Sequence, residues 1–278
     1  MIDLHTHSVY SDGTNTPEEL VELAEKQGLK AIALTDHDTV AGVSELMAAS
    51  KKRAIQAIPA IELSADCERG TMHILGYFVD HTHAAFLEIL KGIQEDRHER
   101  NINILKKLNK LGHVLLWSDV KTEEVQHIVG RPHFAAALVK HNYVKTKKEA
   151  FERLLAKGRP AYIKHFHYSA QACFEFIRAA GGVPVLAHPA TLHLPNDALF
   201  TLLQQMKEDG LAGIETYYAE NNLKNRRTFS DWAKKLDLVC TGGSDFHGGN
   251  SPDLKIGVGF GKLHVPDKVL DQLDAVKP

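Results

Sequence analysis

Residues 31–38 read Ala31-Ile32-Ala33-Leu34-Thr35-Asp36-His37-Asp38, an apolar run that ends in carboxylate and imidazole side chains. Such a short continuous apolar run is consistent with a strand buried on both faces, as in a parallel sheet flanked by helices. In folds of that class, active sites gather at the carboxyl ends of the strands. This stretch therefore predicts both an α/β fold and the edge of the sheet that carries the chemistry.

Strands and helices alternate on both sides of this stretch. A first strand is predicted at 1–4. Thr16-Pro17-Glu18-Glu19 is a capping box with Pro at the first helical position, so a helix begins there, and another helix is predicted over roughly 42–53. Further strands are predicted at 57–61, 74–79, 183–187, 213–217 and 238–241. The alternation predicts one parallel α/β body.

The pattern changes to helices alone in the middle of the chain. Helical spacing runs through Phe86, Leu87 and Leu90 and resumes at Ile104, and a second capping box begins at Thr146. We therefore expect one α/β body formed by residues 1–80 and 168–278, with a helical insertion over 81–167.

Charge divides along similar lines. Residues 81–170 contain 16 Lys and Arg against 9 Asp and Glu, and the rest of the chain contains 17 against 26. The basic segment is expected to attract anions, and the acidic body is expected to bind cations.

Composition excludes several classes of protein. With 278 residues, 44% hydrophobic and 24% charged, the chain is neither disordered, collagenous nor coiled-coil. No apolar run approaches the length of a membrane span, no signal peptide is visible, and the three cysteines have no metal-type spacing. A cytoplasmic location is expected. Sequence-specific DNA binding is disfavoured, because no reading motif is present and the body is acidic.

Imidazole and carboxylate side chains follow most of the predicted strands. His5 and His7 lie two apart in an extended segment, so both rings point to the same side. His73 is the exception, since it precedes or opens a strand. The candidate metal ligands are His5, His7, Asp12, His37, Glu62, His73, His188, Asp245 and His247.

A single histidine at such a position is more often a hydrogen-bonded structural residue than a ligand. Nine such residues at one end of a sheet would leave buried charge uncompensated, and bound metal offsets that cost. Nine ligands are too many for one ion, so two or three divalent ions are expected. Mixed His and carboxylate ligands suit Mn, Zn or Fe. Clustered ions of this kind serve hydrolysis.

Five motifs together resemble those of the PHP (polymerase and histidinol phosphatase) family. They are Asp3-Leu4-His5-Thr6-His7-Ser8 with Ser11-Asp12-Gly13, Thr35-Asp36-His37-Asp38-Thr39, Glu62, His188-Pro189, and Gly243-Ser244-Asp245-Phe246-His247. The resemblance implies a distorted (β/α)7 barrel with a trinuclear site.

The resemblance also implies how the ligands are shared. One ion would be held by His5, His7, Glu62 and Asp245. Glu62 would bridge to a second ion held by His73 and His188, and Asp12, His37 and His247 would hold the third. Catalysis would then involve His5, His7, Glu62, Asp245 and His188.

Two stretches of the insertion narrow the expected substrate. Gly130-Arg131-Pro132-His133-Phe134-Ala135 and Lys157-Gly158-Arg159-Pro160-Ala161-Tyr162 resemble the insertion of PHP phosphoesterases that act on nucleoside 3′,5′-bisphosphates. Related members trim short RNA 5′ ends. The resemblance implies that the substrate is bound by Arg131, His133, Lys157, Arg159 and Tyr162.

The leading hypothesis is a metal-dependent phosphoesterase that releases phosphate from a nucleoside 3′,5′-bisphosphate, with short oligonucleotides as further substrates. A metal-bridging hydroxide would attack phosphorus. One alternative is a histidinol-phosphate-type or other small phosphomonoesterase, and another is a non-catalytic PHP binding module. Roles for His193, Glu215 and Tyr217, and the oligomeric state, are left open.

Overall fold

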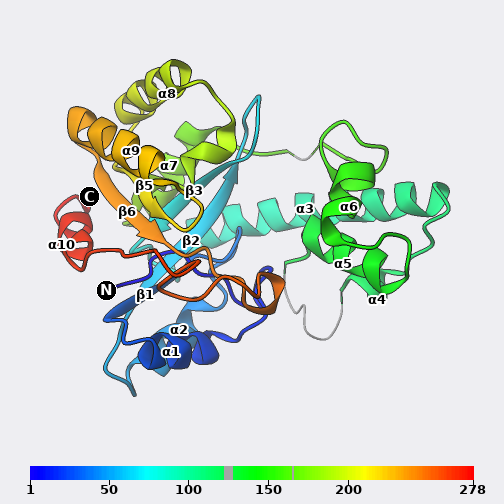
Figure 1. Cartoon of the computed structure of the whole chain (residues 1–278), viewed down its shortest axis with the longest axis horizontal. Helices are drawn as coiled ribbons and strands as arrows, with labels where there is room; N and C mark the ends of the chain where they lie inside the picture. Colours follow the sequence, from blue (N-terminus) through cyan, green and yellow to red (C-terminus); the bar gives the residue numbers. More distant parts are fainter. Residues whose placement is uncertain (122–127, 165) are drawn as a thin grey trace.

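A computed structural model describes residues 1–121, 128–164 and 166–278 (Figure 1). Its centre is a six-stranded sheet in which the strands follow one another in sequence order. The strands are β1 (Ala31–Leu34), β2 (Gln56–Ala65), β3 (Met72–Tyr77), β4 (Val183–Leu186), β5 (Gly213–Tyr218) and β6 (Val239–Gly243).

The N-terminal segment lies between the two outer strands and closes the sheet. The main-chain N–H of Asp3 donates to Ala31 in β1, and that of Leu4 donates to Gly242 in β6. The expected strand at 1–4 is present only as isolated bridges, which pair Ile2 with Val265 and Asp3 with Ile32. Six strands and this seventh extended segment confirm the distorted barrel.

The sheet is mixed, so the prediction of a wholly parallel body is wrong. β3 runs antiparallel to both β2 and β4, whereas the other neighbouring pairs are parallel. The physical reason is the connection between β2 and β3, which spans only residues 66–71 and is too short for a parallel crossover. The reversal brings the first residues of β3, including His73, beside the last residues of β2.

Side chains of β1 alternate between two cores. Ala31 and Ala33 face the barrel interior, and Ile32 and Leu34 pack with the apolar faces of the first two helices. The helices of the body are α1 (Pro17–Lys26), α2 (Val43–Ser50), α7 (Ala170–Ala179), α8 (Asn196–Glu208), α9 (Leu223–Leu236) and α10 (Lys268–Asp274). The predicted capping box at Thr16 is present in α1.

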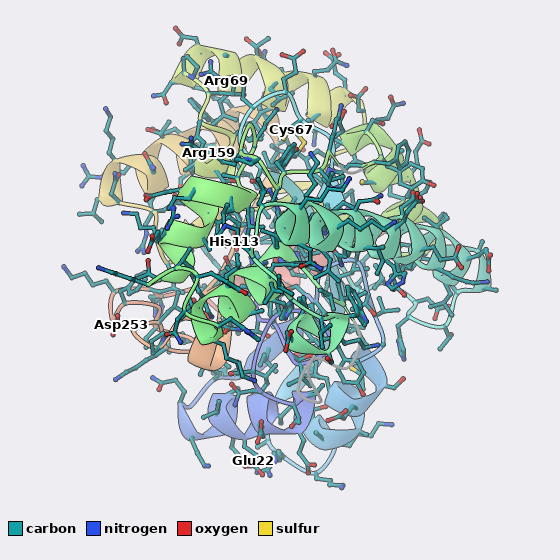
Figure 2. The ribbon with its side chains drawn as sticks, turned by 90° about the vertical axis from the view of Figure 1, so that its right-hand side faces the viewer. Glu22, Cys67, Arg69, His113, Arg159 and Asp253 are labelled. Atoms are coloured by element: carbon teal, nitrogen blue, oxygen red, sulfur yellow. The ribbon has the colours of Figure 1, made fainter. Side chains whose placement is uncertain are left out.

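The middle of the chain forms a helical layer beside the sheet. It contains α3 (Ala84–Lys110), α4 (Trp117–Val120), α5 (Arg131–Lys140), α6 (Lys147–Ala150) and a π-helical turn, η1 (Phe151–Leu155). Figure 1 shows α3 running from the sheet to the group formed by α4, α5 and α6. This group has an apolar core of its own, and its outer side faces the viewer in Figure 2.

Two details of this layer differ from the sequence expectation. The two predicted helical stretches from Phe86 and Ile104 form one 27-residue helix, because no Pro separates them and the helix tolerates Gly92 in its interior. The helix that begins after Thr146 changes into the π-turn η1 instead of continuing as an α-helix. None of the described helices is both long and apolar enough to span a membrane.

Candidate metal centre

All nine predicted ligands lie at one end of the barrel. His5 and His7 belong to the N-terminal segment, and His37 and Glu62 face each other across a bridge between neighbouring strands. Their ligand atoms form four overlapping groups that could each hold an ion. These groups are His7/Asp12/His37/His247, His5/His7/Asp245, His5/Glu62/His188 and His37/Glu62/His73.

Close packing of the backbone makes this convergence possible. A Cβ atom on Gly243 would lie 2.3 Å from the main-chain nitrogen of His5, so only glycine lets the N-terminal segment approach β6 this closely. Asp245, two residues further on, has φ 58°, a left-handed conformation that Asp tolerates better than most residues. The turn at the end of β6 therefore aims the Asp245 carboxylate back at the His5 and His7 rings.

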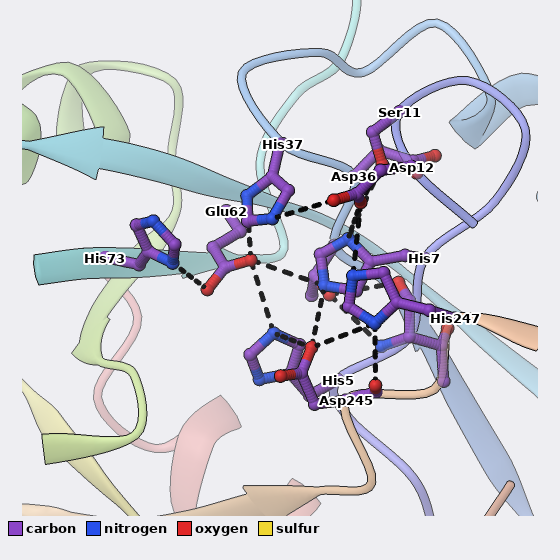
Figure 3. A network of polar contacts seen from close by, with 12 residues as sticks. His5, His7, Ser11, Asp12, Asp36, His37, Glu62, His73, Asp245 and His247 are labelled. Atoms are coloured by element: carbon purple, nitrogen blue, oxygen red, sulfur yellow. Dashed lines mark hydrogen bonds and ion pairs between the residues drawn. The ribbon is translucent and has the colours of Figure 1, made fainter. Parts of the chain in front are cut away.

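Glu62 lies at the centre of the cluster (Figure 3). Its Oε2 atom is 3.4 Å from His5 Nε2, 3.3 Å from His7 Nε2 and 3.0 Å from His37 Nδ1. All four of these atoms are buried, and none of them makes a hydrogen bond. Buried polar atoms that converge without hydrogen bonds are costly to leave unsatisfied, and a cation between them would satisfy all four.

The second carboxylate oxygen of Glu62 faces a different pair of histidines. Oε1 is 2.9 Å from His73 Nδ1 and 2.9 Å from His188 Nε2, and these two nitrogens are 3.3 Å apart. The two oxygens of one carboxylate thus point into two separate groups of imidazole nitrogens. If two ions were bound, Glu62 would be placed to hold both of them.

Asp12 and Asp245 complete the cluster on its opposite side. Asp12 Oδ1 is 3.1 Å from His247 Nε2, and Asp12 Oδ2 is 3.9 Å from His37 Nε2. Asp245 Oδ1 is 3.1 Å from His7 Nε2. A third group of ligand atoms is therefore available around Asp12.

Hydrogen bonds on the far side of three rings leave their other nitrogen free to bind metal. His5 Nδ1 lies 2.9 Å from the Glu215 carboxylate, His247 Nδ1 lies 2.8 Å from the main-chain oxygen of Asp245, and His188 Nδ1 lies 3.0 Å from Thr191 Oγ1. In each case Nε2 points toward a carboxylate of the cluster.

Two residues hydrogen-bond to the candidate ligands. The sequence analysis left the role of Glu215 open and did not predict one for Tyr218. Glu215 accepts hydrogen bonds from the His5 ring and from the main-chain N–H of His188 (2.7 Å). Tyr218, not Tyr217, donates its hydroxyl proton to Asp245 Oδ2 (3.0 Å). Tyr217 packs instead against the barrel core. Side chains alternate between the two faces of a regular strand, so Glu215 and Tyr217 would share a face. In β5 the pairing with β6 shifts register between these two residues, and they therefore have different surroundings.

The electrostatics of the cluster favour bound positive charge. Burial alone would raise the pKa of Glu62, but His37, His73 and His5 hold it well below its ordinary value. Burial lowers the pKa of His73 to about 4, so this ring is neutral at pH 7 and able to bind metal. Burial would also lower the pKa of His247, but Asp12 and Asp245 raise it to about 10. At this ring a metal ion competes with a proton.

The donor set fits divalent transition metals. It consists of imidazole nitrogens and carboxylate oxygens alone, with no cysteine among the groups found in the described chain. The four unsatisfied buried atoms around Glu62 are the observation that supports the fit.

A cavity of about 840 Å³ connects this centre with the helical layer. It is lined by Asp12, His37 and His73 of the cluster and by Arg97, Arg100, Arg131, Lys157 and Tyr162 of the helical layer. The Arg131 guanidinium lies 5.8 Å from the centre of the Tyr162 ring. Lys157 Nζ donates to the main-chain oxygen of Glu68 (2.7 Å), which joins the helical layer to the connection between β2 and β3.

The cavity lining does not include two of the residues predicted to bind substrate. His133 and Arg159 are not among the described residues that line the cavity. His133 Nδ1 accepts a hydrogen bond from the main-chain N–H of Gly130 (2.8 Å) at the start of α5. Arg159 is exposed on the face seen in Figure 2.

Arg97 and Arg100 of α3 were not predicted. Arg100 is 7% exposed, and the Nε atoms of both residues are buried without a hydrogen bond. Burial, with a smaller effect of the neighbouring Arg97 and Arg131, lowers the pKa of Arg100 to about 9. The sequence did contain a signal for this pair. Arg97 and Arg100 are three residues apart, and residues with that spacing on a helix share a face. Three guanidinium groups in one cavity favour an anionic ligand.

Comparison with known proteins identifies the family. The family model described as PHP domain matches residues 3–182, and the chain belongs to this family. It is 34% identical over 245 residues to a 5′-3′ exoribonuclease of Haemophilus influenzae, covering 88% of this chain and 89% of the relative. It is 32% identical over 252 residues to a 3′,5′-nucleoside bisphosphate phosphatase of Chromobacterium violaceum, covering 88% and 87%.

Solved structures agree with this family. A protein from Bifidobacterium adolescentis described as a metal-dependent phosphoesterase superposes with a TM-score of 0.87 at 30% identity, over 99% of this chain and 95% of the other. An amidohydrolase from Chromobacterium violaceum, solved with bound sulfate and no metal, gives 0.86 at 31%, over 99% and 96%. The chain is thus a hydrolase of the metal-dependent phosphoesterase class, as the sequence motifs predicted.

Proposed function

We propose that the protein hydrolyses a nucleoside 3′,5′-bisphosphate to a nucleoside monophosphate and inorganic phosphate. The observation that carries the proposal is the cavity, which is lined both by candidate metal ligands and by Arg97, Arg100 and Arg131. A substrate with two phosphates matches two anion-binding regions in one cavity, whereas a simple monoester needs only the first.

The four ligand groups of the structure contain all nine residues of the metal assignment that the family resemblance implies, although they divide these residues differently. We propose that one ion is held by His5, His7, Glu62 and Asp245, a second by Glu62, His73 and His188, and a third by Asp12, His37 and His247. In support, Glu62 offers a different oxygen to each of the first two groups. Manganese, zinc and iron all suit these ligands.

When bound, such ions activate a water nucleophile and neutralise charge on the phosphoryl oxygens. The protein's own groups then orient the ligands and the substrate. Glu215 fixes the His5 ring through its Nδ1 proton, and Tyr218 holds Asp245 through its Oδ2 atom. The cluster end of the cavity would receive the phosphate to be cleaved.

The phosphate that is not cleaved would lie against the arginines. We propose that Arg131 binds it with two parallel N–H donors, and that Arg100, Lys157 and Tyr162 assist. Arg97 already binds the Asp38 carboxylate, so fewer of its donors are free. The bound sulfate in the Chromobacterium violaceum structure supports anion binding by a protein of this fold. We assign His133 and Arg159 no direct contact, because neither lines the cavity.

A second candidate substrate is the 5′ end of a short RNA. The observation in its favour is the 34% identity to a 5′-3′ exoribonuclease over most of both chains. The same cavity contacts would serve, with the arginines binding a neighbouring phosphate of the strand.

One experiment tests the proposal and separates the candidates. Metal analysis of the purified protein should find two or three transition-metal ions per chain. Phosphate release should then be measured on 3′-phosphoadenosine 5′-phosphate, AMP and histidinol phosphate, and release of a mononucleotide should be measured on a 5′-phosphorylated trinucleotide. We expect the bisphosphate to be the best substrate, and faster release from histidinol phosphate would contradict the proposal.

A further inference from the structure

Three buried aspartates near the metal centre belong to none of the four ligand groups. Asp3, Asp36 and Asp38 are each no more than 1% exposed. Burying a carboxylate is costly unless it is well hydrogen-bonded, and each of the three is bound in the same way. One oxygen accepts the main-chain N–H of a serine, and the other accepts the hydroxyl of the same serine.

The three contacts have matching geometry. Asp3 binds Ser244 at 2.9 Å (N) and 2.6 Å (Oγ). Asp36 binds Ser8 at 2.8 Å and 2.6 Å. The third contact, between Asp38 and Ser64, measures 2.8 Å and 3.0 Å. We call these three pairs the Asp–Ser clamps.

Each clamp joins two neighbouring segments of the barrel. The first joins the N-terminal segment to the end of β6, the second joins the residues after β1 to the N-terminal segment, and the third joins the residues after β1 to β2. The clamps therefore link four consecutive strand ends in an unbroken row. These ends, with the loop after His7, carry seven candidate ligands: His5, His7, Asp12, His37, Glu62, Asp245 and His247.

The clamps lie within two residues of these ligands in the sequence. Ser8 follows His7, Ser244 precedes Asp245, Asp38 follows His37, and Ser64 is two residues after Glu62. A hydrogen bond to a carboxylate is stronger than one between neutral groups, and two to one serine restrict both its main chain and its side chain. Movement of a clamp would thus displace a ligand directly.

The third clamp also reaches the substrate cavity. Arg97 binds both the Asp38 carboxylate and Ser64 Oγ (3.1 Å), and Gln94 donates to the main-chain oxygen of Asp38 (2.9 Å). Both residues belong to α3. This clamp therefore holds the helix that carries Arg100 against the strands that carry His37 and Glu62.

From this row of contacts we infer that Asp3, Asp36 and Asp38 are positioning residues that set the affinity of the centre for metal. The inference rests on the proposed function, because it requires that the cluster binds metal. Partners that orient metal ligands commonly contribute about ten- to a hundredfold in metal affinity. His73 and His188 lie outside the row of clamped strand ends. We therefore expect loss of a clamp to disturb the positions of these two ligands least.

The test removes one hydroxyl at a time, in Ser8→Ala, Ser64→Ala and Ser244→Ala. Each variant keeps the main-chain hydrogen bond of its clamp. The full-length proteins are stripped of metal with a chelator, and circular dichroism identifies the variants that remain fully folded. Mn²⁺ affinity is then measured by competition with a chromogenic chelator, and stability by urea unfolding without metal.

Affinity separates positioning from stability. While a variant is almost wholly folded without metal, a loss of stability alone cannot change its affinity for Mn²⁺. We expect each folded clamp variant to bind Mn²⁺ about ten- to a hundredfold more weakly than the unsubstituted protein.

Two controls match the clamp variants. Thr82→Ala removes the same kind of hydroxyl contact, with Asp80, at an exposed position (2.6 Å). Leu203→Ala removes a buried side chain from the core between the helices and the sheet, and it should lower the stability of the protein. Both should bind Mn²⁺ as the unsubstituted protein does. If every folded clamp variant also keeps full affinity, the clamps are structural only and the inference fails. Should the unsubstituted protein itself bind neither Mn²⁺, Zn²⁺ nor Fe²⁺, the proposed function fails, and the inference with it.

Discussion

The end of the barrel that carries the candidate metal centre and the helical layer differ in how firmly they hold their polar side chains. At the barrel end, the Glu62 and His5 side chains are fully buried and contact other ligands on several sides. In the helical layer, Lys157 and Arg159 are exposed and Arg131 is half-buried beside the Tyr162 ring, whereas Arg100 of α3 is buried. A rigid, preorganised site suits bond cleavage, whereas less constrained cations suit recognition of a substrate that enters and leaves. From this difference we expect the barrel to carry catalysis and the layer to select the substrate.

The largest expected effect comes from the barrel end. His5→Ala should remove bound metal and lower kcat by more than about a thousandfold, because metal ions supply several kcal/mol of transition-state stabilisation. Metal analysis and phosphate release measure the two effects, and circular dichroism checks that the variant is folded. Full activity in a metal-stripped His5→Ala protein would contradict the division of roles.

A smaller and selective effect is expected in the helical layer. Arg131→Ala should remove a charged hydrogen bond of about 1.5–3 kcal/mol, which lowers kcat/KM for the bisphosphate about ten- to a hundredfold. Metal content should stay the same, and a substrate without the second phosphate should be affected much less. Arg159→Ala is the matched control, because this arginine is exposed and does not line the cavity.

Equal losses on both substrates would mean that Arg131 contacts the cleaved phosphate or only supports the fold. If Arg131 contacts the cleaved phosphate, the helical layer takes part in catalysis, and the division of roles between barrel and layer is wrong.

The smallest expected effect concerns His133. His133→Ala removes the acceptor for the Gly130 N–H and should lower the free energy of unfolding by about 1 kcal/mol. Because the side chain does not line the cavity, kcat/KM should change less than threefold, on the order of 0.6 kcal/mol. Urea unfolding and steady-state kinetics give the two values. A loss as large as that of Arg131→Ala would show that the ring contacts substrate, as its motif suggested.

Local patterns in the chain determined the elements and the candidate ligands. The apolar run at 31–34 and the capping box at Thr16 predicted β1 and α1, because both depend on neighbouring residues only. The ligand positions followed from the rule that chemistry lies at the carboxyl ends of strands, which holds for Glu62 and His188. His73 did not fit that rule, and the antiparallel direction of β3 explains why.

Other features depended on contacts between residues far apart in the chain. The sequence alone determined an α/β body with a helical insertion and nine candidate ligands, since periodicity and motifs are read along the chain, and its resemblance to the PHP family implied the barrel. Only the tertiary structure decided that Glu215 holds His5, that Arg97 and Arg100 face the cavity, and that the three aspartates clamp serines on neighbouring strands. Each of these pairs joins segments whose distance and orientation are set by packing of the whole sheet, and no local pattern encodes that packing.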